Sequence, residues 1–394
     1  MSDDNMAKNT VNKAVTDIEV DRSRLFESLS RIVIKIGTTS VTNDDSTVNT
    51  SFLDDIAAQT SALMAAGKEV IIVTSGAIGV GLLMLGIPTK PKEIPARQAA
   101  AAVGQGELMR YWSEAFQNYN TQVAQILLSY DFYSDRVKYL NLRNSIGTLL
   151  GYGVVPIINE NDSTCTNEIE TVFGDNDRLS AMVASKIEAN LLIILSDIDG
   201  LYDKNPKVYP DAKLISFVEK ITPEIEAYGG DPTSMKGVGG MRTKLIAGKI
   251  CEKAGCHMVI ANSKIENVIE RVVAGDNIGT LFYAAEENVS NNKSRWISFS
   301  KSEGTISVDR GAMDAVIKTS GLLPKGIKSV SGNFKRGDVV SIECGGAVFA
   351  KGITDYDAQD IEKIKGVHTD DIEKILGHKD YDNVIRKENI ALLD

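Results

Sequence analysis

The sequence predicts an α/β fold with a mostly parallel central sheet, followed by a small β-rich domain. From Arg31 to about Phe282, short runs of β-branched residues alternate with longer helical patterns. These runs are apolar almost throughout, as expected of strands that are covered on both faces. After Gly279 the pattern changes to short strand-like pieces separated by glycine. Strand–helix alternation is typical of a parallel sheet, whereas short strands with glycine-rich turns indicate a separate β-rich domain.

Strands and helices alternate in order along the first region. The expected strands are Arg31–Ile36, Val70–Thr74, Val123–Leu128, Val154–Ile158, Leu191–Ser196 and His257–Ile260. The expected helices are Ser51–Ala66, Pro95–Asn118, Tyr139–Leu150, Asp177–Ile187, Lys244–Ala254 and Lys264–Ala274. Thr50 or Ser51 can cap the first helix, and Gly67 can end it because glycine tolerates a left-handed backbone.

The second region is expected to hold strands at Gly304–Val308, Val339–Ile342 and Ala347–Lys351. A polar stretch with turn-forming residues, Asn288–Lys293, is predicted to be the linker. We therefore predict an N-terminal extension over residues 1–30, an α/β domain over 31–287 and a β-rich domain over 296–394. The start of the extension is polar and is expected to be poorly ordered.

Composition excludes several classes of protein. The 394 residues are 43% hydrophobic, which is enough apolar material for packed cores and excludes global disorder. No apolar run approaches the roughly 18 residues that cross a bilayer, and the N-terminus has no signal-type stretch, so a cytoplasmic protein without a membrane partner is expected. The net charge of −10 disfavours non-specific nucleic-acid binding. With only 4 cysteines in the chain, reduced thiols are expected.

Glycines and polar residues gather where the predicted strands end. Because ligands of open parallel sheets bind outside the carboxyl ends of the strands, these positions predict one site. The segments concerned are Lys35–Ser40, Ser75–Gly81, Asn159–Asp162, Gly174–Asp177 and Ser196–Asp197. Their carboxylate and amide groups can hold an amino group or orient lysines that carry charge. No histidine lies near Ser75 in the sequence, which disfavours Ser/His/Asp hydrolysis.

A glycine-rich segment, Gly237–Lys244, is flanked by basic residues and leads directly into a predicted helix. Backbone N–H groups and the positive end of a helix attract anions, and Lys244 is long enough to reach one. A flexible surface loop is the alternative. Neither a Gly-x-Gly-x-x-Gly dinucleotide motif nor a Gly-x-x-x-x-Gly-Lys-Ser/Thr motif is present, so the segment predicts an anion site of another kind.

With these residues assembled, the chain closely resembles the glutamate 5-kinases, enzymes of the amino-acid-kinase fold that begin proline synthesis. The segments that carry the resemblance are Val33–Ser40, Val70–Gly81, Val154–Asp162, Gly174–Asp177, Leu195–Tyr202 and Gly239–Lys244. In the second region, Leu323–Gly337 is similar to part of a PUA domain. The resemblance covers about Arg31 to Asp394. It implies a three-layer amino-acid-kinase fold around a mostly parallel sheet, followed by a small PUA-like domain.

The resemblance implies a role for each candidate residue. The catalytic groups would be Lys35 and Lys244, which contact the phosphates, and Asp177, which orients both lysines. The residues that bind glutamate would be Ser75, Gly76, Asp162 and Asn176. The residues that bind ATP would be Lys35, Ser196, Asp197, Val238, Gly239, Gly240, Met241, Arg242, Thr243 and Lys244. Mg²⁺ is expected to arrive with the nucleotide, and no metal site made by protein residues alone is expected.

The same resemblance implies a reaction and its partners. The expected activity is ATP-dependent phosphorylation of the γ-carboxylate of L-glutamate to γ-glutamyl phosphate, the first step of proline biosynthesis. Proline is expected as feedback inhibitor, a homo-oligomer as the assembly, and a glutamyl phosphate reductase as the receiver of the product. Two alternatives stay open: a sister kinase for aspartate or acetylglutamate, and an RNA-binding protein that acts through its PUA-like domain.

Overall fold

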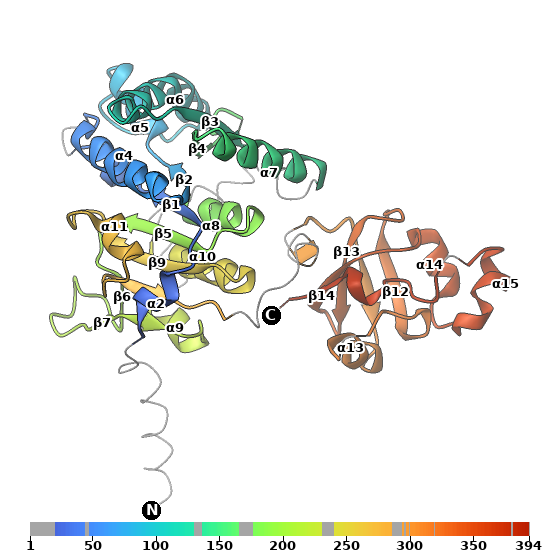
Figure 1. Ribbon diagram of the computed structural model, residues 1–394. Helices are drawn as coiled ribbons and strands as arrows, with labels where there is room; N and C mark the ends of the chain where they lie inside the picture. The colour runs from blue at the N-terminus through green and yellow to red at the C-terminus, as the bar shows by residue number, and fades with distance from the viewer. Residues whose placement is uncertain are drawn as a thin grey trace, which may run out of the picture. The chain divides into compact units, whose positions relative to one another are not determined.

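The computed structural model describes residues 20–43, 47–129, 136–164, 176–230, 240–285, 294, 297–298, 300–318, 320–379 and 381–393. The chain divides into two compact units, of which the first holds residues 1–130 and 140–289 and the second holds residues 131–139 and 290–394 (Figure 1). The first 19 residues and the predicted linker 288–293 lie outside the described residues, so the exact ends of the predicted domains stay predictions.

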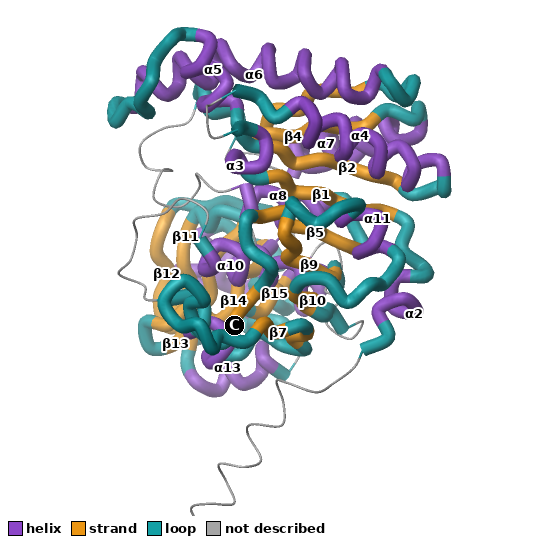
Figure 2. Tube along the Cα trace, turned by 90° about the vertical axis from the view of Figure 1, so that its left-hand side faces the viewer, coloured by secondary structure: helices purple, strands orange, loops and turns teal. Residues whose placement is uncertain are grey.

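The first unit is built on an 8-stranded sheet with the order β3-β4-β2-β1-β5-β9-β10-β8. Figure 2 shows β2, β1, β5 and β9 side by side. The parallel strands are β1 (Arg31–Ile36), β2 (Glu69–Thr74), β3 (Val123–Leu128), β4 (Val155–Glu160), β5 (Leu191–Ser196) and β9 (His257–Asn262). Each predicted strand of this region is therefore confirmed.

Short strands complete the sheet at one edge. β10 (Thr280–Phe282) runs antiparallel to β9 and pairs with β8 (Phe217–Val218), while β6 (Leu201–Tyr202) and β7 (Leu214–Ile215) form a small ribbon of their own. These pieces were not predicted, because two or three residues are too few to show a strand pattern.

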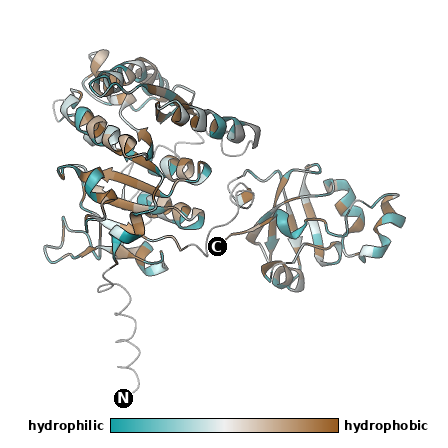
Figure 3. Cartoon of the chain, in the orientation of Figure 1, coloured by the Kyte–Doolittle hydropathy of each residue, from teal (hydrophilic) through white to brown (hydrophobic). Residues whose placement is uncertain are grey.

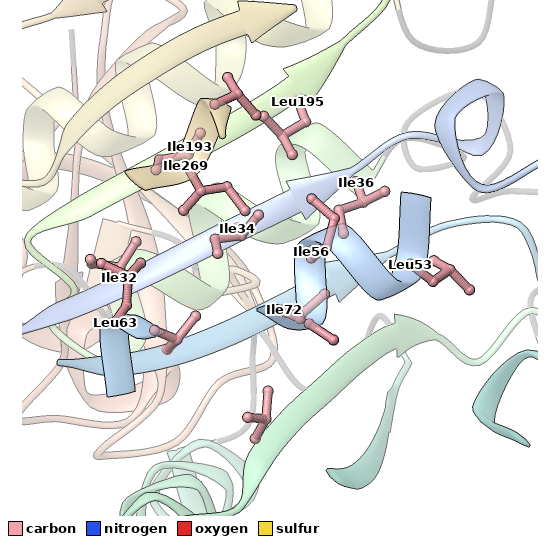
Figure 4. Close-up of a cluster of buried hydrophobic side chains, with 14 of the residues drawn as sticks. Ile32, Ile34, Ile36, Leu53, Ile56, Leu63, Ile72, Ile193, Leu195 and Ile269 are labelled. Carbon is pink, nitrogen blue, oxygen red and sulfur yellow. The ribbon is translucent and has the colours of Figure 1, made fainter. Parts of the chain in front are cut away.

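Helices cover both faces of the sheet and give three layers (Figure 1). On one face lie α4 (Thr50–Ala65), α6 (Ile94–Gln117) and α11 (Val268–Val273), which share a core with Ile34 and Ile72 of the strands (Figure 4). On the other face lie α8 (Asn176–Lys186) and α10 (Met241–Ala254), packed against each other. Successive strand residues point to opposite faces, so Lys35 points toward the α8 side while Ile34 and Ile36 point toward α4.

The other helices of this unit are α2 (Arg22–Phe26), α3 (Thr38–Val41), α5 (Ala77–Met84), most of α7 (Arg136–Gly151) and α9 (Pro223–Ala227). The structure differs from the predictions at several helix starts, most of all in α7, α10 and α11, and α7 begins three residues before the predicted Tyr139. Asn49, not Thr50 or Ser51, caps α4 by accepting from the N–H of Phe52. α11 begins at Val268 rather than Lys264, and α10 begins at Met241, one turn earlier than expected.

Part of the predicted N-terminal extension belongs to the folded first unit. Arg22 begins a short helix, and its guanidinium donates to the carbonyl oxygens of Ser216 at 2.6 Å and Ile278 at 2.7 Å. Phe26 and Leu29 are buried in the core. Residues 21–30 are therefore held by packing and hydrogen bonds rather than extending from the domain.

The second unit has a 5-stranded sheet with the order β12-β11-β13-β14-β15. The strands are β11 (Gly304–Val308), β12 (Ile327–Gly332), β13 (Val339–Cys344), β14 (Ala347–Ile353) and β15 (Ile390–Leu392), and the helices are α13 (Arg310–Ile317), α14 (Ala358–Ile364) and α15 (Ile372–Leu376). Phe334, Ile342 and Tyr356 lie in its core, separate from that of the first unit. Hydrophobic strands and more hydrophilic helix surfaces are visible in both units (Figure 3).

Candidate active site

Lys35, Asp177 and Lys244 come together at the carboxyl end of β1. Lys35 is the penultimate residue of that strand, whereas Asp177 and Lys244 lie in the first turns of α8 and α10. Lys35 Nζ lies 2.5 Å from Asp177 Oδ1, and Lys244 Nζ lies 2.9 Å from Asp177 Oδ2. The Thr243 hydroxyl also donates to Asp177 Oδ2, at 3.1 Å. The structure thus assembles the three side chains that the sequence predicted to be catalytic.

This cluster is buried. The side chain of Asp177 is 0% exposed, that of Lys35 8% and that of Lys244 4%. Burial alone would raise the pKa of Asp177, but the ammonium groups of Lys35 and Lys244 outweigh it and hold that pKa below its usual range. Two ammonium groups that meet at the end of one strand can both contact an anionic ligand.

The N-terminus of α10 adds to this attraction for anions. Gly240 precedes the helix in an extended conformation, and α10 continues for 14 residues. The first N–H groups of any helix have no partner inside the helix, and they form the positive end of its dipole. Of the residues predicted to bind ATP here, Met241 is half-buried and Arg242 is exposed, while Val238 and Gly239 lie outside the described residues.

Ser196 and Asp197 lie at the same edge of the sheet. β5 pairs directly with β1, so that Ile194 is the partner of Lys35 and Ser196 ends the neighbouring strand. The Ser196 hydroxyl donates to Asp197 Oδ1 at 3.2 Å. Both residues are therefore close in the sheet to the lysine cluster, as the sequence predicted for groups that hold a nucleotide.

Asn176 joins the ends of β2 and β4. Its amide nitrogen donates to the carbonyl oxygen of Thr74 at 2.7 Å, to Ser75 Oγ at 2.7 Å and to Asn159 Oδ1 at 3.0 Å. Two residues predicted to bind the substrate, Ser75 and Asn176, are therefore in direct contact. Since Asn176 immediately precedes Asp177, this second cluster adjoins the first.

Gly76 allows α5 to begin directly after Ser75. Its φ of 109° lies in the left-handed region, and a Cβ on this residue would lie 3.0 Å from Cγ1 of Val41. Both facts favour glycine at this position. The sequence indicated a glycine-rich turn here, but the helix that starts at Ala77 was not predicted. Its first N–H groups consequently lie beside Ser75.

Asp162 lies in a cavity of about 290 Å³, whose lining also includes Ala77, Gln105 and Glu160. Burial and, to a lesser extent, the negative charge of Glu160 raise the pKa of Asp162 to about 6, against the opposing charges of Lys90 and Arg97. A carboxylate in such a place gains from a cationic partner. Among the described residues, Asp162 makes no direct hydrogen bond to Ser75 or Asn176, but Gln105 connects the cavity to their cluster.

Gln105 was given no role by the sequence analysis, and Asn159 was predicted only as part of the segment Asn159–Asp162 at the end of a strand. Gln105 Oε1 accepts from Asn159 Nδ2 at 2.9 Å, and both side chains are buried. The signal for Gln105 was its place in α6, where Ala101, Leu108 and Trp112 form a buried stripe at helical spacing. A polar residue in such a stripe needs a hydrogen-bond partner inside the protein.

The comparisons with known proteins agree with this arrangement. The amino acid kinase family matches residues 30–262, and the PUA domain matches residues 304–376. A glutamate 5-kinase of Methanosarcina barkeri is 64% identical over 381 residues, which are 95% of this chain and 99% of that protein. The chain belongs to the glutamate 5-kinases of the amino acid kinase family. A family member from Caldanaerobacter subterraneus is 44% identical over 92% of this chain and 98% of its own length.

Family membership confirms the three-layer fold and the PUA domain that the sequence predicted. Among solved structures, UMP kinase from Bacillus anthracis is similar over 65% of this chain and 96% of its own, with 15% identity and a TM-score of 0.44. An isopentenyl phosphate kinase is similar over 64% of this chain and 99% of its own, with 19% identity and a TM-score of 0.43. In the described part of the chain, no helix combines the length and apolar character needed to cross a membrane.

Proposed function

We propose that the protein transfers the γ-phosphoryl group of ATP to the γ-carboxylate of L-glutamate, the first step of proline biosynthesis. A carboxylate oxygen of glutamate bonds to the γ-phosphorus, the bond from that phosphorus to the bridging oxygen of ADP breaks, and γ-glutamyl phosphate and ADP leave. The buried Lys35–Asp177–Lys244 cluster is the observation that carries this proposal. The names of relatives at up to 64% identity support glutamate as the substrate.

The cluster suits phosphoryl transfer because that reaction depends mostly on positioning and on neutralising charge. Lys35 and Lys244 approach Asp177 from different elements, so that phosphate oxygens between them would meet ammonium groups on two sides. Asp177 keeps both lysines in place. Each lysine would therefore act on the transferring group, and Asp177 would act by orienting the lysines.

The acceptor needs no general base. A γ-carboxylate has a pKa of about 4.3 and is already ionised at neutral pH. This fits the position of His257, the first residue of β9, which packs between Phe26 and Tyr283 and is not part of the lysine cluster. The difficulty is the approach of one anion to another, and the ammonium groups of Lys35 and Lys244 would reduce this repulsion.

Glutamate would lie between the lysine cluster and the Asp162 cavity. The carboxylate of Asp162 would accept from the substrate's ammonium group, and Ser75, Gly76 and Asn176 would bind along its length. This order places the γ-carboxylate toward Asp177, because Asn176 and Asp177 are consecutive in α8. Ser196, Asp197 and the start of α10 would then hold the nucleotide.

Mg²⁺ would arrive on the phosphates of ATP and add positive charge at the transferring group. Asp177, the carboxylate at the centre of the lysine cluster, is already paired with two lysines. Within the described ranges, no group of three or more His, Cys, Asp or Glu side chains is placed to hold a metal ion. Magnesium with few protein ligands and several phosphate and water ligands is the usual arrangement for such substrates.

The remaining partners follow from the chemistry of substrate and product. Proline resembles the cyclised skeleton of glutamate, so it would inhibit by binding to Ser75, Asp162 and Asn176. The product is a reactive acyl phosphate, which favours hand-over to a glutamyl phosphate reductase. A cytoplasmic homo-oligomer completes the proposal.

Binding of RNA by the PUA domain is a second candidate function, favoured by the exposed Lys325, Lys328 and Lys335. A gel shift at physiological salt tests it.

The proposed activity is tested by trapping the acyl phosphate. Purified protein with ATP and Mg²⁺ should release ADP in proportion to added L-glutamate, and hydroxylamine should convert the product to the γ-hydroxamate. Aspartate and acetylglutamate, tested at equal concentration, should give much slower turnover. Hydroxamate from either of them and none from glutamate would overturn the assignment in favour of a sister kinase.

A further inference from the structure

Gln105 ends a chain of buried amides that leads to the proposed substrate groups. Its oxygen accepts from Asn159 Nδ2 at 2.9 Å, and Asn159 Oδ1 accepts from Asn176 Nδ2 at 3.0 Å. Asn176 Nδ2 also donates to Ser75 Oγ. Gln105 is 8% exposed and Asn159 is 2% exposed, so water cannot easily replace these partners. This series of side-chain hydrogen bonds therefore connects α6 to α8.

Backbone groups fix the direction of every hydrogen bond in this chain. The carbonyl oxygen of Thr74 can only accept, so the group that Asn176 turns toward it must be its nitrogen. The N–H of Glu160 can only donate, so the group that Asn159 turns toward it, at 2.9 Å, must be its oxygen. The nitrogen of Asn159 then points to Gln105, whose side-chain oxygen must accept the hydrogen bond.

This direction decides what the substrate meets. The two N–H hydrogens of Asn176 are turned to three oxygen atoms, one hydrogen being shared, and its carbonyl oxygen has no hydrogen-bond partner among the described residues and is open to a ligand. Ser75 Oγ accepts from that nitrogen, so its hydroxyl hydrogen is left to donate. An amino acid presents both an ammonium group and carboxylate groups. The ammonium group requires an acceptor such as Asn176 Oδ1, and a carboxylate requires a donor such as the Ser75 hydroxyl.

We propose that Gln105 is a positioning residue for glutamate. By accepting from Asn159, it keeps Asn176 and Ser75 turned so that the first accepts from the substrate and the second donates to it. The proposal rests on the proposed function. Gln105 lines the cavity of Asp162 and lies on α6, whereas the lysine cluster is formed by β1, α8 and α10. Its loss should therefore weaken glutamate binding and leave ATP binding intact.

The test compares variants that keep or remove the acceptor. Gln105→Met is similar in length and suits a helix, but its sulfur is a weak acceptor. It should raise the glutamate KM about tenfold, which is about 1.4 kcal/mol and near the value of one hydrogen bond. The ATP KM should stay within about twofold and kcat within about threefold. Gln105→Leu serves as a second variant without an acceptor.

Gln105→Glu is the conservative variant that restores the acceptor. The nitrogen it replaces has no hydrogen-bond partner among the described residues, so the exchange breaks no such bond there. Its glutamate KM should return to within about threefold of wild type. Gln117→Leu, an exposed position at the end of the same helix, is the matched control and should change neither KM. Thermal unfolding of each variant shows whether the fold is retained.

A mutant cycle separates positioning from a general structural role. In an Asn159→Ala background the oxygen of Gln105 has lost the amide donor that it accepts from, so Gln105→Met should raise the glutamate KM no further. Folded Gln105→Met and Gln105→Leu variants with unchanged glutamate KM, a Gln105→Glu variant as impaired as Gln105→Met, or additive effects in the cycle would each overturn the proposal. A wild-type protein that forms no hydroxamate from glutamate would overturn the proposed function as well, so the two failures are distinguishable.

Discussion

Gly81 of α5 and Gly104 of α6 lie backbone to backbone where the two helices cross. A Cβ on Gly81 would lie 1.8 Å from the carbonyl oxygen of Ala100, and a Cβ on Gly104 would lie 2.0 Å from the carbonyl oxygen of Ala77. Neither distance leaves room for any side chain. The crossing brings the start of α5, next to Ser75, against the turn of α6 that carries Gln105. These glycines consequently shape the proposed substrate site without offering it a functional group.

Gly104→Ala should destabilise the protein, because the added methyl group meets backbone atoms that cannot turn away. Overpacking of this kind costs about 1–3 kcal/mol or more, and it should lower the free energy of unfolding by at least that much. Urea unfolding measures it. Gly147→Ala is the control, since a Cβ there meets nothing within 4 Å inside α7. That variant should gain about 0.5–1 kcal/mol. Equal stability of both variants would contradict the close crossing.

Lys244→Ala should lower kcat far more than it raises the glutamate KM, because its ammonium group would act on the transferring phosphoryl group. The loss of such a preorganised charge typically costs about 10²–10³ in rate. Lys249→Ala is the matched control on the same helix, where the lysine pairs with Glu226 at the surface and its side chain is 42% exposed. Its kcat should stay near that of wild type. A folded Lys244→Ala variant within about threefold of wild-type activity would refute the role.

Asp162→Asn should change how stability depends on pH. The pKa of Asp162 is raised from 3.8 to about 6 by burial and by Glu160. The native state therefore keeps this proton to higher pH than the unfolded chain, and the carboxyl's contribution to stability is lost as pH rises from about 4 to about 6. The variant, which does not titrate there, should gain stability relative to wild type across this window and keep a constant advantage above it.

Urea unfolding of both proteins at about pH 4.5, 5.5 and 7.5 measures this difference. Glu160→Gln provides a further check, because removing the neighbouring negative charge should lower the pKa of Asp162 and move the window toward acid. A stability difference between Asp162→Asn and wild type that is the same at every pH would show that the carboxyl is not shifted.

Ser75→Ala, Asp162→Ala and Asn176→Ala should mainly raise the glutamate KM and leave the ATP KM unchanged. Asp162 should matter most, because hydrogen bonds to charged groups contribute about 1.5–3 kcal/mol, roughly 10- to 150-fold in KM. If proline inhibits the enzyme, the same substitutions should weaken its inhibition. Steady-state kinetics with each substrate varied in turn measures both effects. An unchanged glutamate KM in all three variants would place the substrate elsewhere.

The sequence predicted the middle of the sheet and the place of the site for one physical reason. Buried parallel strands are apolar on both faces, so β1 and β5 stand out, and their carboxyl ends must share one edge. Lys35 and Asp177 could therefore be expected in one site, and the resemblance to the glutamate 5-kinases implied that Asp177 orients Lys35. The contact of Thr243 with Asp177 could not, because it depends on the turn of α10 in which the helix begins.

Other features depend on tertiary contacts that leave little trace in the sequence. α5 contains two glycines, Gly79 and Gly81, and follows Gly76 directly, so that its helical pattern is hidden in the sequence. The two to three residues of β8 and β10 show no periodicity. The direction of the amides of Gln105 and Asn159 is set by backbone groups of β4 and by Thr74, residues distant in the chain from Gln105. Such hydrogen-bond directions follow only from the folded arrangement.

Cutting the chain after Ser290 should leave a folded and active kinase whose regulation or metal dependence is altered. Every candidate site residue, from Lys35 to Lys244, belongs to the first unit, and the sheet of that unit is complete at Phe282. Each unit buries its own apolar residues, with a core around Ile34 in the first and around Ile342 in the second. A unit with its own core can fold without the other.

The fragment of residues 1–290 should therefore show a circular dichroism spectrum typical of a folded α/β protein. Its kcat should lie within about threefold of that of the full chain, since no group proposed for phosphoryl transfer is removed. The full-length protein prepared in parallel is the control, and proline and Mg²⁺ titrations of both proteins reveal any change in regulation. A fragment that is well folded but wholly inactive would show that the second unit completes the active site, and the separation of catalysis from the PUA domain would be wrong.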